Sequence, residues 1–149
     1  MLSLDRAKWL LARCTEWWQA ARRTREKLRH EALQRARAEQ RALSLLIGLL
    51  DPEQRREFQS HGYFHVIGGS TGDRYRIRLD SAVNIDVLGE HGIVRYHLCA
   101  RPNGNLPMYD VMAAQLLHLQ DSGAELRFLS QANRHVTLSF AAMGRWQER

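Results

Sequence analysis

Scarcity of cysteine, proline and long apolar runs sets the first limits on this 149-residue chain. Its two cysteines, Cys14 and Cys99, are too few for a disulfide framework, and a chain of this length can bury a core without one. We therefore expect a reducing, cytoplasmic compartment. The strongest apolar run, at residues 42–50, is about half as long as the stretch of ~20 residues that spans a bilayer, so the sequence predicts no membrane span.

Proline is absent before residue 52, and Gly48 is the one glycine in that part of the sequence. Ala, Leu, Arg, Glu and Gln, which favour helix, dominate it. The sequence therefore predicts one long helix, or two helices with a joint at residues 22–25. Eleven of fourteen positions at the spacing of a helical seam are apolar: Leu4, Ala7, Leu11, Cys14, Trp18, Ala21, Arg25, Leu28, Ala32, Arg35, Glu39, Ala42, Leu46 and Leu49. The three charged positions lie near the middle, so we expect buried partners at both ends of the helix and a solvated or polar-facing middle.

A compact part follows at residue 51, where the sequence carries a helix-start signal. Asp51 suits the N-cap, Pro52 the first helical position and Gln54 the third position of a capping box. Gly62 then breaks the helix, and apolar and polar residues begin to alternate with the period of two that is typical of half-buried strands. We expect an antiparallel meander with strands at 63–67, 73–79, 83–88 and 93–99.

Helical spacing returns after a turn-rich loop at residues 101–107. The pattern predicts helices over 108–120 and 124–133, which would cover the apolar face of the sheet. A short alternating segment then predicts a strand over 135–140, and a tail containing Trp146 ends the sequence.

The predicted fold class is α+β, with a long N-terminal helix followed by an antiparallel β-meander packed against C-terminal helices. Its domains would be a basic amphipathic helical arm at residues 1–50 and a compact α+β domain at residues 51–149. The first range holds eleven Lys and Arg against five Asp and Glu, whereas the second holds eleven of each. The whole net charge of +6 therefore belongs to the predicted arm, which favours an anionic partner.

Most of this charge lies in residues 22–37, which we call the basic segment. Seven cationic residues occur there against two acidic ones: Arg22, Arg23, Arg25, Lys27, Arg29, Arg35 and Arg37. Such a helix can lie along a nucleic-acid backbone, because each phosphate that it neutralises releases counterions. The sequence therefore predicts contact with nucleic acid or an acidic protein surface.

Two other interpretations of the basic segment stay open. It could be the solvated surface of a coiled coil, with Glu26 and Glu31 forming helix-spaced ion pairs. It could also lie on a membrane surface, which Trp9, Trp17 and Trp18 would favour, although the apolar face is interrupted where the charge is highest.

A second cationic feature is the arginine row, Arg74, Arg76 and Arg78, which period two places on one face of the sheet with Arg95 nearby. The row could track phosphates or bind carboxylates. Alternatively, its members pair with Asp86 and Asp80 across the strands. We expect no aromatic platform for single-stranded nucleic acid on this face, because Tyr75 and Tyr96 point to the other side.

The glycine cluster Gly68, Gly69 and Gly72 raises the question of a phosphate-binding loop. Such a loop works at a helix N-terminus after a strand, and its last glycine is followed by Lys-Ser or Lys-Thr. Here the glycines lead into a strand-like segment. A turn between strands is the better interpretation.

Histidine and cysteine could indicate a metal site or a nucleophile. His97 and Cys99 share a strand face, and His61, His65 and His91 could lie near them, but no metal-ligand spacing is present. Cys99 could act as a nucleophile with His97 as its base, yet a cysteine at a strand end is usually a small core residue. We therefore expect no metal, no cofactor and no enzyme activity.

Part of the sequence, over about residues 58–133, resembles a small domain of uncharacterised bacterial and phage proteins. The shared elements are a YRI strand, LC before a loop with Pro107, then DVMxAQxLxL and a final FLxxAN. The resemblance implies an α+β fold and carries no activity. The sequence departs from the pattern in having Arg101 and Pro102 after LCA, where a histidine often appears near the cysteine, and this departure weakens the metal interpretation further.

Together, these features predict a non-enzymatic accessory or adaptor protein that contacts nucleic acid or an acidic partner through the basic segment. The alternative is an assembly protein whose N-terminal helix is a coiled-coil arm for homo-oligomerisation or docking. A third interpretation, an enzyme with a site around Arg95, His97 and Cys99, requires a deep pocket on the polar face of the sheet.

Overall fold

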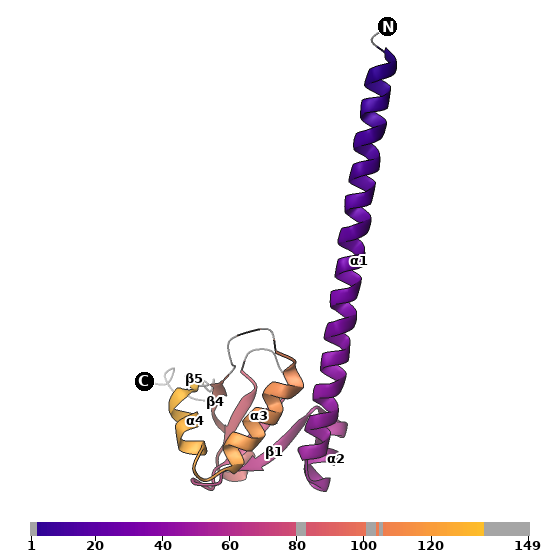
Figure 1. Ribbon diagram of the computed structural model, residues 1–149. Helices are drawn as coiled ribbons and strands as arrows, with labels where there is room; N and C mark the ends of the chain where they lie inside the picture. The colour runs from indigo at the N-terminus through magenta and orange to yellow at the C-terminus, as the bar shows by residue number, and fades with distance from the viewer. Residues whose placement is uncertain (1–2, 80–82, 101–103, 105, 136–149) are drawn as a thin grey trace, which may run out of the picture. The chain divides into compact units, whose positions relative to one another are not determined.

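The computed structural model describes residues 3–79, 83–100, 104 and 106–135, with side chains from residue 16 onward. It has the predicted α+β class. The first element, α1 (Ser3–Leu49), is one continuous helix of 47 residues, so the joint considered at residues 22–25 is not formed (Figure 1). Its continuity follows from the absence of proline and from helix-favouring residues throughout.

The chain divides into two compact units, Met1–Gln40 and Arg41–Arg149. The sequence predicts a domain boundary at residue 50, whereas the second unit includes the last turns of α1. Ala42, Leu46 and Leu50 are buried in the core of that unit, which accounts for their apolar spacing.

A short helix, α2 (Pro52–His61), follows at the predicted start signal. The Asp51 side chain accepts hydrogen bonds from the backbone N–H groups of Glu53 and Gln54, both at 2.8 Å, and the Asp51 N–H donates to Gln54 Oε1 at 3.1 Å. This is a complete capping box. Gly62 ends the helix with φ +71°, a value that glycine adopts without strain.

The sheet has five antiparallel strands in the order β1-β2-β3-β4-β5. The four strands of the predicted meander are present, and a fifth pairs with β4 at the sheet edge. Their bounds are β1 (Tyr63–Ile67), β2 (Arg74–Arg78), β3 (Ile85–Leu88), β4 (Val94–Cys99) and β5 (Asn133–His135). A 3-10 turn, η1 (Glu90–Gly92), joins β3 to β4. The expected strand at 135–140 lies almost entirely outside the described residues, as does Trp146.

Two C-terminal helices, α3 (Met108–Gln120) and α4 (Glu125–Gln131), complete the unit (Figure 1). Met112, Leu116 and Leu119 of α3 join the apolar core formed with the sheet, so the predicted covering helix is confirmed. The buried amides of Asn84 and Gln115 form two hydrogen bonds, at 2.6 and 3.1 Å, which tie α3 to the segment leading into β3. The second helix is shorter than the predicted 124–133, because Asn133 begins β5.

Candidate nucleic-acid interface

The basic segment lies entirely within α1, and its seven cationic side chains are all exposed. A helix turns by about 100° per residue, so the spacing of these residues distributes them around its circumference. Arg22 and Arg23, for example, are a quarter-turn apart, and Arg35 lies on a third side. The segment is therefore cationic in every direction and not along a single stripe.

The two acidic residues of the segment do not neutralise these cations. Among the described residues, no ion pair reaches any of the seven, so the helix-spaced pairs that the coiled-coil alternative gives to Glu26 and Glu31 are not formed. The polar side-chain contacts of this stretch are local ones, from Thr24 to the Ala20 carbonyl and between Gln34 and His30. The positive charge of the segment is consequently presented to solvent.

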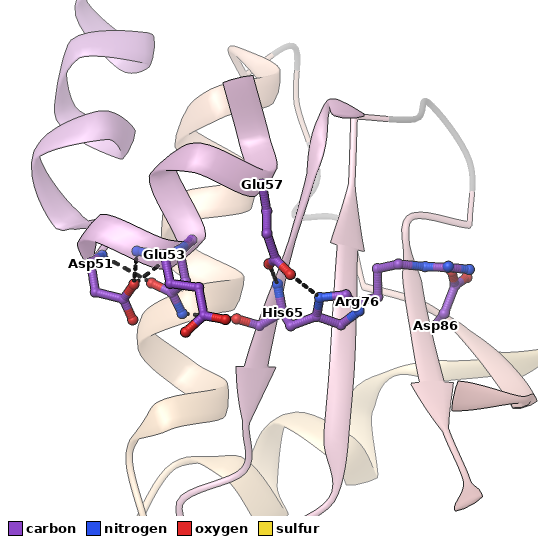
Figure 2. Close-up of polar contacts among 7 residues, drawn as sticks. Asp51, Glu53, Glu57, His65, Arg76 and Asp86 are labelled. Carbon is purple, nitrogen blue, oxygen red and sulfur yellow. Dashed lines mark hydrogen bonds and ion pairs between the residues drawn. The ribbon is translucent and has the colours of Figure 1, made fainter. Parts of the chain in front are cut away.

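The arginine row is different, because two of its members are bound within the sheet. Arg76 donates to Asp86 Oδ2 at 2.7 Å through Nε, and Arg78 donates to Asp86 Oδ1 at 3.2 Å. Figure 2 shows the contact between Arg76 and Asp86. The cross-strand pairing that the sequence offered as an alternative is thus present for Asp86, while Asp80 lies outside the described residues. Arg74 is exposed.

Asp86 is the centre of a polar row that crosses the sheet. Strand register aligns His65, Arg76, Asp86, His97 and His135 on one face, and His97 Nδ1 lies 2.6 Å from Asp86 Oδ1. Burial by itself raises the pKa of the Asp86 carboxyl, but hydrogen bonds from Arg76 and His97, with the charges of Arg78 and Arg76, outweigh burial and lower that pKa. The buried carboxylate therefore stays ionised and fixes its neighbours.

An aromatic ring does lie on this face, contrary to the sequence-based expectation. Tyr63 is aligned with Arg78, and the guanidinium carbon of Arg76 lies 5.4 Å from the centre of the Tyr63 ring. His61 stacks on the same ring at 5.2 Å. The signal for this ring is the alternation in β1. Phe64 and Val66 are buried there, so Tyr63 must face the other way.

The Glu57–His65 pair occupies the side of this face next to α2. His65 Nδ1 is 2.7 Å from Glu57 Oε1, and the His65 backbone N–H donates to Glu57 Oε2 at 2.9 Å (Figure 2). A cleft of about 400 Å³ adjoins the pair and is lined by Asp51, Glu53, Gln54, Glu57, His65, Ile67, Arg74 and Gln120. Its carboxylates are unsuited to an anionic ligand, and those of Asp51 and Glu57 already serve as a helix cap and a histidine partner.

Histidine and cysteine do not converge on one site within the described part of the chain. The described residues contain no group of three or more His, Cys, Asp or Glu side chains placed to hold a metal ion. Cys99 is partly buried, and no hydrogen bond connects it to His97 among the described residues, since His97 Nδ1 is engaged with Asp86. The geometry thus lacks the contact between nucleophile and base that a catalytic cysteine needs.

The glycine loop, residues 68–72, is a turn between β1 and β2, as predicted, yet it also binds an anion from its own chain. The buried Glu125 carboxylate accepts hydrogen bonds from the backbone N–H groups of Ser70, at 2.6 Å, and Thr71, at 3.0 Å. The Thr71 and Tyr75 hydroxyls donate to its other oxygen at 2.5 and 2.7 Å. No phosphate can enter while Glu125 occupies these donors.

This arrangement, which we call the Glu125 clasp, has a clear electrostatic basis. Burial by itself raises the pKa of Glu125, but hydrogen bonds from Thr71, Tyr75 and Ser70 outweigh burial and lower it. Burial also raises the pKa of Tyr75, so its phenol remains protonated and donates. Sequence reasoning missed the clasp because Glu125 is separated from the loop by more than fifty residues.

Comparisons with protein-family models, curated proteins and solved structures find no match to this chain. The resemblance over residues 58–133 therefore stays a prediction. Within the described part of the chain, no helix is both long enough and apolar enough to cross a membrane.

Proposed function

We propose that this protein is a non-enzymatic accessory or adaptor that binds nucleic acid through the basic segment of α1. The observation that carries the proposal is the exposure of seven cations, from Arg22 to Arg37, that have no ion-pair partner among the described residues. Unpaired charge at this density is unfavourable in an isolated helix and becomes favourable beside phosphates.

The placement of charge around the helix favours a duplex groove as the binding site. A helix in the major groove has a phosphate chain on each side, so cations on opposite faces can both make contacts. A helix lying on a flat anionic protein surface would use only the cations of one face. The binding expected here is independent of base sequence and strongly salt-dependent, since it depends on phosphates.

The sheet face makes at most a secondary contribution. Arg76 and Arg78 are held by Asp86, and Arg95 lies 3.5 Å from Asp73, so much of their charge is balanced within the unit. Arg74 is the exposed member of the arginine row. Replacement of Arg74 should therefore weaken binding less than replacement of a cation in the basic segment.

The proposal is tested by binding of the full chain to a DNA duplex across a salt series. In a plot of log affinity against log salt concentration, the double variant Arg22→Gln/Arg29→Gln should have a slope smaller in magnitude by up to about 2. Each lost phosphate contact removes about 0.9 from that slope. Glutamine keeps the helix propensity close to that of arginine. The matched control is Arg56→Gln/Arg127→Gln, which removes two exposed cations of the second unit and should leave the slope unchanged.

Equal loss of affinity in both variants, or no binding by the wild-type chain, would contradict the proposal. A parallel titration with poly-glutamate separates the two partner classes. Preference for poly-glutamate over duplex at equal salt would assign the basic segment to an acidic protein surface instead.

A further inference from the structure

The helix of the first unit carries exposed apolar surface as well as charge. Trp17 is 68% exposed and Leu28 is 59% exposed. Three small side chains lie between them, with Arg25 beside these, and the result is a hollow of about 490 Å³ lined by Trp17, Ala20, Ala21, Thr24, Arg25 and Leu28. Exposed large apolar side chains around a hollow indicate a surface that is covered in the functional state.

The spacing of the hollow identifies the kind of element that covers it. Trp17, Ala20, Ala21 and Thr24 stand at positions i, i+3, i+4 and i+7, which is the four-residue hole that receives a side chain from a facing helix in a coiled coil. This face differs slightly from the seam predicted from the sequence. The hole is formed with Trp17 and Thr24, whereas the predicted seam contains Trp18 and Arg25. The occupant that fits is therefore a helix.

We propose that the occupant is the same helix of a second copy of this chain, running antiparallel. The two-fold axis crosses the pair midway between the levels of residues 22 and 23 along the helix. Each copy then presents Trp17 opposite Leu28 of the other, and Ala21 opposite Thr24. The large side chains thereby flank a centre of small ones, which allows close approach of the two helices. The surface is self-complementary, as a two-fold interface requires.

Charge decides between the antiparallel and parallel arrangements. In a parallel pair, Glu31 and Arg35 would each face their own copy along the seam, and two basic segments of net charge +5 would lie side by side. The antiparallel pair moves most of each basic segment beside residues 8–21 of the other copy, whose net charge is only +1. Repulsion is therefore much smaller in the antiparallel pair.

The inference can be tested apart from nucleic-acid binding, because the contacts that hold the pair are those of the apolar face, although Arg25 of the basic segment also lines the hollow. Arg22, Arg23, Arg29 and Arg37 lie away from this seam and would remain accessible in the pair. Self-association measured without nucleic acid can therefore fail while the proposed function holds, and the reverse is also true.

A matched pair of leucines provides the first test. Leu28 and Leu33 are 59% and 60% exposed, but Leu33 lies about 140° away around the helix, outside the seam. Sedimentation equilibrium of the full chain, in high salt and without nucleic acid, should show a dimer. Leu28→Gln should weaken dimerisation on the order of 100-fold, because two leucines per dimer lose their burial, while Leu33→Gln should leave it unchanged.

Orientation is tested by a spin label at Ala36→Cys in a chain with Cys14→Ser and Cys99→Ser. The antiparallel pair places the two labels about 40 Å apart along the helix axis, since the residues are displaced by 1.5 Å per position from the two-fold axis. A parallel pair would bring them within roughly 20 Å. A short distance, a monomer at all concentrations, or equal effects of Leu28→Gln and Leu33→Gln would each overturn the proposal.

Discussion

At the scale of single residues, the charges of this protein fall into two classes with different roles. Those of the basic segment are exposed and have no ion-pair partner among the described residues, whereas Asp86 and Glu125 are buried and fully engaged. A buried carboxylate is stable only when hydrogen bonds or positive charges replace its hydration. Asp86 has hydrogen bonds together with the charges of Arg76 and Arg78, whereas Glu125 is held, among the described residues, by neutral hydrogen-bond donors alone. Both carboxylates are therefore structural centres of the second unit and not free ligands.

Replacement of Glu125 tests the first of these centres. In Glu125→Gln, the carboxamide keeps one acceptor oxygen but turns an NH₂ group toward donors of the clasp, which leaves buried polar groups unpaired. We expect a loss of about 3 kcal/mol in the free energy of unfolding of the second unit. Urea unfolding, followed by amide exchange in β2, measures it. Glu90→Gln, at an exposed site, should change that free energy by less than about 0.5 kcal/mol; a similar small effect at Glu125 would show that the clasp is dispensable.

At the scale of elements, signals within a few residues predicted the helices and strands well, whereas contacts between distant residues could not be predicted from the sequence. The Asp51 capping box and the alternation that starts at Tyr63 are encoded within a few residues, so the helix start and the strands could be predicted. The same alternation also implies that Tyr63 lies on the face opposite Phe64, which is the polar face of the sheet. The ion pairs at Asp86 depend on strand register, which alternation restricts but does not determine alone.

The contact of Glu125 with Thr71 was beyond sequence reasoning, because it needs the path of the chain through α3 and back to the first hairpin. The basic segment lies in a helix, as predicted. Its lack of ion pairs among the described residues depends on side-chain rotamers, which the sequence does not specify. Residue types and spacing therefore predicted the elements, whereas the partners of charged groups required three-dimensional structure.

Glycines in the elements provide a second test, because they differ in what a side chain would meet. A Cβ at Gly69 would lie 2.3 Å from the backbone oxygen of Gln120, whereas a Cβ at Gly48 would have nothing within 4 Å. Gly69→Ala must therefore push the hairpin loop away from the end of α3, and we expect it to destabilise the second unit by at least about 2 kcal/mol. Gly48→Ala, in the helix, should be neutral or stabilise it by up to about 1 kcal/mol. Urea unfolding of the second unit, followed by amide exchange in β2, gives the order of stability of the two variants and the wild-type chain. A reversed order would contradict the close approach of Gly69 to Gln120.

At the scale of the whole molecule, the two units respond to different conditions. The first is a helix with exposed cations around it, so we expect its stability to respond to salt, whereas the second has its own apolar core and two buried carboxylates. A single melting temperature is therefore not a well-defined property of this chain. Three of the four tryptophans, Trp9, Trp17 and Trp18, belong to the first unit, so tryptophan fluorescence reports mainly on that unit. Unfolding of the second unit needs a probe of its own.

Acid should unfold the second unit selectively. The pKa values of Asp86 and Glu125 are lower in the folded state than in the unfolded chain, where they are about 4. Their stabilisation is thus fully present above the unfolded values and is lost as pH falls through the folded ones, since the unfolded chain binds protons first. We expect exchange protection of β2 and β3 amides to be constant from pH 7 to about 5, after correction for intrinsic exchange, and to fall steeply below about 4. In Glu125→Gln, which removes one of the two groups, the fall should be shallower; an unchanged slope would exclude Glu125 as a source of the acid sensitivity.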